Sequence, residues 1–126
     1  DYNRAVLMLA VLEKRAGLMI GACDAYINVI GGLRLDEPAI DLPVALAIAS
    51  SFLEKPVIDT CAALGEIGLT GELRAISNLS QRLNEVARLG FTKCLIPNQD
   101  TEFLKIPASL ELIKVKNLHE AIQKAL

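Results

Sequence analysis

The stretch that decides the fold is GEIGLTGELRAISNLSQRLNEVARLGFTKCLIP, residues 65–97. Residues 72–76 alternate between polar and apolar and follow an apolar segment broken by glycines, which predicts two strands of a hairpin joined through Thr70-Gly71. Residues 78–89 place their apolar side chains on one stripe, which is typical of an amphipathic helix. Residues 93–96 are typical of a strand. This stretch therefore predicts the order strand, strand, helix, strand.

The segments on either side extend the same alternation of element types. Residues 39–52 (AIDLPVALAIASSF) are apolar nearly all round and predict a buried helix that tolerates Pro43 in its first turn. Further helices are predicted over residues 3–15 and 117–126, and further strands over residues 18–20, 25–30 and 110–115. With no linker or internal repeat, residues 1–126 form one domain of the mixed α/β class.

Composition excludes several classes of protein. The chain has 126 residues, 52% of them hydrophobic, and a net charge of -2, so it is neither disordered nor strongly basic. The longest nearly uncharged run, residues 39–52, is shorter than the roughly 20 residues that cross a bilayer. Neither a Walker-type loop nor a dinucleotide-binding glycine motif occurs, so no nucleotide site of either kind is predicted.

Cysteine and acidic residues give no clear metal site. Cys23, Cys61 and Cys94 are widely spaced and accompanied by a single histidine, His119, so they predict buried thiols in a reducing cytoplasm; a Cys/His nucleophile pair is the alternative. Three carboxylates surround the start of the predicted core helix: Asp36, Glu37 and Asp41. We expect them to cap the helix, and a divalent ion is the alternative.

Three stretches, residues 1–18, 27–51 and 65–97, resemble the C-terminal domain of the bacterial RadA (Sms) family of DNA repair proteins. The strings VLEKR, GGLRLDEPAIDL and GEIGLTGELRA carry this resemblance. It implies a Lon-protease-like fold, a two-layer α/β sandwich of the ribosomal-protein type, as the C-terminal part of a longer ATPase. It also implies upstream domains that use ATP, Mg and Zn, a homo-hexamer, branch migration on double-stranded or branched DNA, and a recombinase partner.

The same resemblance raises the alternative of a Lon-type peptidase, which needs a Ser nucleophile and a Lys base. Counting along the peptidase motifs places Ala39 at the Ser position and Ser80 at the Lys position. Arg82 lies close to Ser80 in sequence but stays protonated and cannot serve as a base. We therefore expect no peptidase activity in this chain.

Four cations in or next to the matching stretches are the candidate DNA contacts: Arg15, Arg34, Arg74 and Lys114. Each lies at an element end or at an alternate strand position, where a side chain faces outward. The sequence pI of about 5.4 argues against a free-standing nucleic-acid module, but six copies around one channel would add their charges. The resulting hypothesis is a non-catalytic hexamer scaffold and DNA-binding platform, with a pure oligomerisation module as the alternative.

Overall fold

The computed structural model describes residues 1–28 and 37–126. Its helices, in chain order, are α1 (Tyr2–Arg15), the short 3-10 helix η2 (Pro38–Ile40), α2 (Asp41–Leu53), α3 (Leu79–Arg88) and α4 (Leu118–Ala125). Its strands are β1 (Cys61–Ala63), β2 (Glu66–Ile67), β3 (Leu73–Arg74), β4 (Lys93–Pro97) and β5 (Glu111–Val115). The mixed α/β class that the sequence predicts is confirmed.

The strands form a parallel sheet and a separate hairpin. The sheet has the order β1-β4-β5, with β4 in the middle and parallel to both neighbours. The hairpin pairs β2 with β3 in antiparallel register, so that Glu66 lies opposite Arg74. The predicted turn through Thr70-Gly71 is therefore confirmed.

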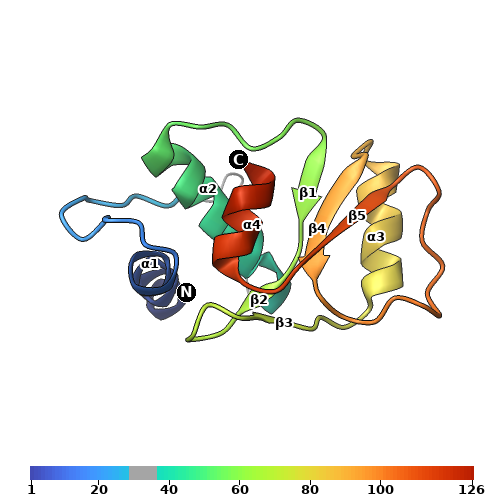
Figure 1. Ribbon diagram of the computed structural model, residues 1–126, viewed down its shortest axis with the longest axis horizontal. Helices are drawn as coiled ribbons and strands as arrows, with labels where there is room; N and C mark the ends of the chain where they lie inside the picture. Colours follow the sequence, from blue (N-terminus) through green and yellow to red (C-terminus); the bar gives the residue numbers. More distant parts are fainter. Residues whose placement is uncertain (29–36) are drawn as a thin grey trace.

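Side chains of β4 point alternately into two hydrophobic clusters. Leu95 packs with α1, α2 and α4, whereas Cys94 and Ile96 pack with α3. Figure 1 shows the sheet between these groups, with α2 and α4 on one side and α3 on the other. The connection from β1 to β4 runs through the β2–β3 hairpin and α3, and α3 covers the face of the sheet to which Cys94 and Ile96 point.

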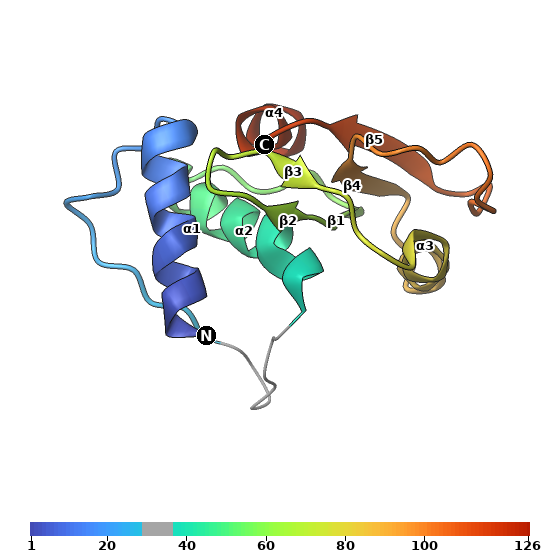
Figure 2. The same cartoon turned by 90° about the horizontal axis from the view of Figure 1, so that it is seen from below.

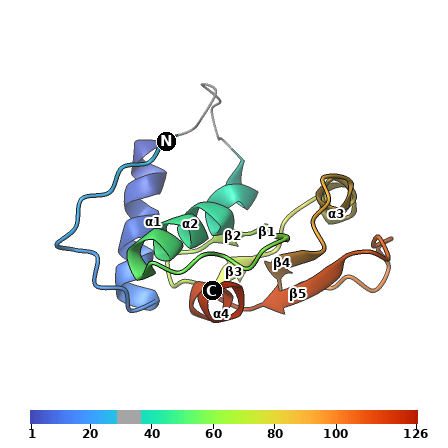
Figure 3. The ribbon, with the colours of Figure 1, turned by 90° about the horizontal axis from the view of Figure 1, so that it is seen from above.

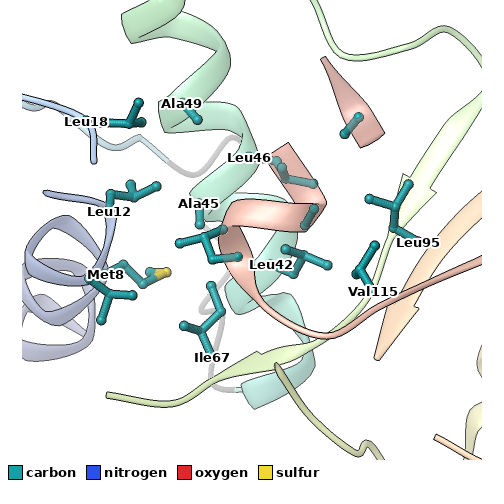
Figure 4. Packing of buried hydrophobic residues seen from close by; sticks show 14 residues of the cluster. Met8, Leu12, Leu18, Leu42, Ala45, Leu46, Ala49, Ile67, Leu95 and Val115 are labelled. Atoms are coloured by element: carbon teal, nitrogen blue, oxygen red, sulfur yellow. The ribbon is translucent and has the colours of Figure 1, made fainter. Parts of the chain in front are cut away.

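The larger cluster holds the three other helices together. Leu12 of α1 and Leu42 of α2 are fully buried, and Ala45 lies between the two helices, as Figure 4 shows. Figure 3 shows α1 packed across α2 at the end of the molecule remote from α3. No helix among the described residues combines the length and apolar composition that a bilayer crossing requires.

The predicted helices are confirmed, and capping side chains mark the starts of two of them. The Asp1 carboxylate accepts a hydrogen bond from Asn3 N at the start of α1, and the Asn117 amide oxygen accepts one from Glu120 N at the start of α4. Gly17 and Gly90 follow α1 and α3 with positive φ angles. Helix ends follow from local chemistry, which is why the sequence locates them well.

The strand predictions are partly wrong. Residues 18–20 and 25–28 form no strand, and residues 29–30 lie outside the described residues. Residues 21–28 are exposed, and no described strand pairs with them, so their apolar residues lack the neighbouring backbone that a strand requires. The first predicted hairpin strand is divided between β1 and β2, because the Gly65 N–H donates to the Ala39 carbonyl, 2.8 Å away, instead of continuing the ladder to β4.

The three cysteines also differ from one another. Cys94 is buried and Cys61 half-buried, but Cys23 is exposed, so the prediction of a buried thiol is wrong for Cys23. Cys23 lies in the exposed segment 21–28 that does not form the predicted strand, which explains its exposure.

Candidate nucleic-acid interface

Arg15 lies in the last turn of α1, where the helix contacts the turn of the β2–β3 hairpin. A Cβ atom built on Gly71 would lie 3.0 Å from the Cβ of Arg15, so the hairpin turn packs directly against the helix end. Figures 1 and 2 show this turn beside α1. Arg15 is exposed and has no ion-pair partner among the described residues. Its charge is available to an external anion.

Arg74 projects from the same hairpin, at the end of β3. Its side chain is 56% exposed, and its Nη1 atom lies 4.0 Å from Oε1 of Glu66 on the opposite strand. Because cross-strand partners in an antiparallel pair face each other, the hairpin register brings this carboxylate and the Arg74 guanidinium together.

Lys114 lies on β5, an edge strand of the parallel sheet, and its side chain is exposed. The segment after β5 then passes beside the hairpin: Leu73 N donates to the Lys116 carbonyl (3.0 Å), and Leu118 N donates to the Gly71 carbonyl (2.8 Å). Two backbone hydrogen bonds thus join the hairpin to the segment that follows β5. Arg74 lies on this hairpin, and Arg15 lies against its turn.

The structure brings two of the four candidate cations together. Arg74 is on the β2–β3 hairpin and Arg15 packs against its turn. Lys114 is two residues before Lys116, whose carbonyl accepts a hydrogen bond from the hairpin. Arg34 lies outside the described residues. Exposed Lys116, which sequence reasoning missed, lies where that segment meets Leu73; the alternation in LIKVK is the signal that identifies it.

An ion pair behind the hairpin, between buried Asp41 and part-buried Arg4, is a feature that the sequence did not predict. Asp41 is 2% exposed, and its carboxylate accepts hydrogen bonds from Arg4 Nε (2.7 Å), Arg4 Nη2 and Ile67 N (3.0 Å). The hydrogen bond to Asp41 is the main cause that raises the pKa of Arg4. The pair joins the first turns of α1 and α2 to β2. Its partners are 37 residues apart, so no local pattern reveals it.

The predicted acidic cluster is engaged in internal contacts. Glu37 Oε1 accepts hydrogen bonds from Ala39 N (3.2 Å) and Arg82 Nη2 (3.0 Å), and Asp41 binds Arg4. Asp36 lies outside the described residues. Glu37 thus acts as the cap that the sequence predicts, and within the described residues no group of His, Cys, Asp and Glu side chains is arranged to hold a metal ion.

The two peptidase positions lie on η2 and α3, which the Glu37–Arg82 ion pair connects. Ala39 is buried and contributes its backbone to Glu37 and Gly65. The Ser80 hydroxyl donates to the Lys105 carbonyl over 3.1 Å. Ala39 has no nucleophilic atom and Ser80 has no basic one, so these two positions cannot perform Ser-Lys chemistry.

Residues 8–100 match the model of the family described as subunit ChlI of Mg-chelatase. The chain is also 48% identical, over 98% of its length, to DNA repair protein RadA of Streptococcus pneumoniae, and 47% identical, over its whole length, to that of Listeria monocytogenes. A third relative, DNA repair protein RadA of Streptococcus pyogenes, is 50% identical over 98% of the chain. The chain spans 30%, 28% and 27% of these relatives, respectively.

Proposed function

The chain belongs to the family described as subunit ChlI of Mg-chelatase, and we propose that it is a non-catalytic, DNA-binding domain of a RadA-type DNA repair protein. The observation that carries this proposal is the 48% identity that extends over 98% of the chain. In this proposal the domain has the Lon-protease-like fold and is the C-terminal part of an ATP-dependent protein of the cytoplasm. Other parts of that protein hold ATP, Mg and Zn.

The DNA contacts that we propose are Arg15, Arg74 and Lys114, together with Arg34. The exposure of the three described cations supports this assignment, as does the position of Arg74 on the hairpin and of Arg15 against its turn. Each copy would neutralise few phosphates because the chain as a whole is slightly acidic. We therefore propose that the domain acts in a homo-hexamer, where the contacts of six copies add along one duplex or branched DNA.

The absence of catalysis in the proposal rests on the two peptidase positions. Buried Ala39 and a Ser80 hydroxyl bound to a backbone carbonyl give no nucleophile and base to a peptide substrate. The guanidinium of Arg82 is paired with Glu37 and does not deprotonate in proteins. The remaining roles are DNA contact, assembly of the ring, and contact with a recombinase.

Fluorescence anisotropy with short double-stranded DNA, measured across a salt titration, tests the DNA role. We expect binding that weakens steeply with salt, and an R15A/R74A/K114A variant whose affinity and salt slope are both reduced. Each lost phosphate contact lowers the slope of log K against log salt by about 0.9. Adding Arg34→Ala to this variant tests the fourth cation.

A matched control removes three exposed cations elsewhere: Lys55 after α2, Arg88 on α3 and Lys124 on α4. The K55A/R88A/K124A variant has the same net charge as the test variant, so equal losses in both would refute the assigned surface. Light scattering on the same samples reports assembly. If the chain forms rings but does not bind DNA even at low salt, the alternative of a pure oligomerisation module would hold instead.

A further inference from the structure

The carboxylate of Glu66 lies between two guanidinium groups. Its Oε1 atom is 3.8 Å from Arg4 Nη2 and 4.0 Å from Arg74 Nη1. Glu66 is on β2, Arg74 is its cross-strand partner on β3, and Arg4 comes from the first turn of α1. The Glu66 side chain is 30% exposed and that of Arg4 35%, so both charged groups are partly accessible to solvent.

The two arginines differ in what else they bind. Arg4 donates two hydrogen bonds to buried Asp41, so its charge is already compensated inside the protein. Arg74 has Glu66 as its ion-pair partner, lies close enough to Glu72 to help lower the pKa of that carboxyl, and is more exposed than Arg4. Together the two carboxylates and two guanidiniums are electrically neutral. Removing the Glu66 charge would leave this group of four side chains with one net positive charge, and Arg74 would lose its only ion-pair partner among the described residues.

We propose that Glu66 is a specificity-determining residue that restrains Arg74, so that a phosphate must displace this carboxylate before the arginine binds DNA. The inference rests on the proposed DNA-binding function and adds a restraint to it. An exposed ion pair at 4.0 Å is weak enough for a duplex phosphate to compete with it. Glu66 thereby disfavours single, isolated phosphate contacts and makes binding depend on several cations acting together.

The test compares Glu66→Gln with Glu85→Gln in the salt titration with short double-stranded DNA. Glu85 is a matched control because it also pairs with an arginine, Arg88, on the exposed surface of α3. Both substitutions raise the net charge by one and free one guanidinium. For E66Q we expect an affinity gain of about two- to fivefold at low salt, because Arg74 no longer has to give up its ion pair before it binds a phosphate.

A double variant, E66Q/R74A, assigns the effect to Arg74. We expect it to bind as R74A does, because the carboxylate acts through that arginine. Glu66→Thr, which suits a strand, gives a second way to remove the charge, and thermal unfolding checks that each variant is folded. If the native chain binds DNA, unchanged binding by E66Q would overturn the inference. The same gain in affinity for E85Q, or for E66Q/R74A relative to R74A, would overturn it as well. A native chain that does not bind DNA would overturn the proposed function itself.

Discussion

Asp41 shows how a residue in a predicted carboxylate cluster acquires a structural role. It lies at the first position of α2, where a negative charge is favoured by the helix dipole. Its two oxygens are bonded to Arg4 and to the Ile67 backbone, and no buried side-chain polar atom in the described part of the chain lacks a partner. A buried carboxylate satisfied in this way positions β2, and with it the hairpin that carries Arg74.

Cys94 gives a prediction about pH. Burial, with a smaller contribution from Cys61, raises its pKa to about 12, whereas an unfolded cysteine has a pKa of about 8.5. The folded chain therefore binds more protons between these values, and the stability present below about pH 8.5 is lost progressively as the pH rises. Urea unfolding of the native chain and of Cys94→Ala, each at pH 8 and pH 10, measures this change.

We expect the native chain to lose more stability than Cys94→Ala over this pH interval. Thiol labelling of the folded chain at pH 8 is an independent check, because exposed Cys23 should react at once and Cys94 only after unfolding. Rapid labelling of Cys94 in the folded chain would contradict the assignment.

At the scale of elements, the contact between α1 and the hairpin turn positions two of the candidate cations. Gly71 has a φ of +83°, and any Cβ there would meet the Cβ of Arg15. Both the backbone conformation and the close approach therefore require glycine at this position.

The prediction is that Gly71→Ala destabilises the chain more than Gly90→Ala does. Gly90 also has a positive φ, +95°, but a Cβ there would meet no atom within 4 Å. Gly90→Ala should cost about 1–2 kcal/mol for the left-handed backbone alone. Gly71→Ala carries the same backbone cost, and in addition its new Cβ atom crowds the Cβ of Arg15 on α1. Thermal unfolding of both variants measures the difference, and equal losses would show that α1 does not hold the turn.

At the scale of the whole molecule, the central strand β4 couples two hydrophobic clusters. Leu95 faces the cluster of α1, α2 and α4, and Cys94 and Ile96 face the cluster of α3. If β4 unfolds, both hydrophobic clusters lose side chains that pack in them. The two clusters should therefore unfold together.

Leu12→Ala and Leu83→Ala test this coupling, since each leucine is fully buried in a different cluster. Each substitution should cost about 2–5 kcal/mol. We expect both to shift one common transition in urea, with costs that add within about 0.5 kcal/mol in the double variant because the sites are separate. Two transitions, of which each substitution moves only one, would contradict a single cooperative unit.

The sequence by itself determined the features that depend on neighbours along the chain. Helix periodicity, the caps Asp1 and Asn117 and the turn at Thr70-Gly71 are local, and all were predictable. The sequence also supplied Arg15 and Arg74 as candidate contacts. It did not identify Lys116, although the alternation in LIKVK contained the signal.

The tertiary structure decided what depends on distant partners. Residues 18–20 and 25–28 have the composition of strands but no described strand pairs with their backbone. The apolar segment before Thr70-Gly71 contributes β1 to one sheet and β2 to another, and between them Gly65 N donates a hydrogen bond to the Ala39 carbonyl. The Arg4–Asp41 pair and the position of Glu66 between two arginines join α1, α2 and the hairpin. Such contacts form between residues that only folding brings together, so no local pattern in the sequence encodes them.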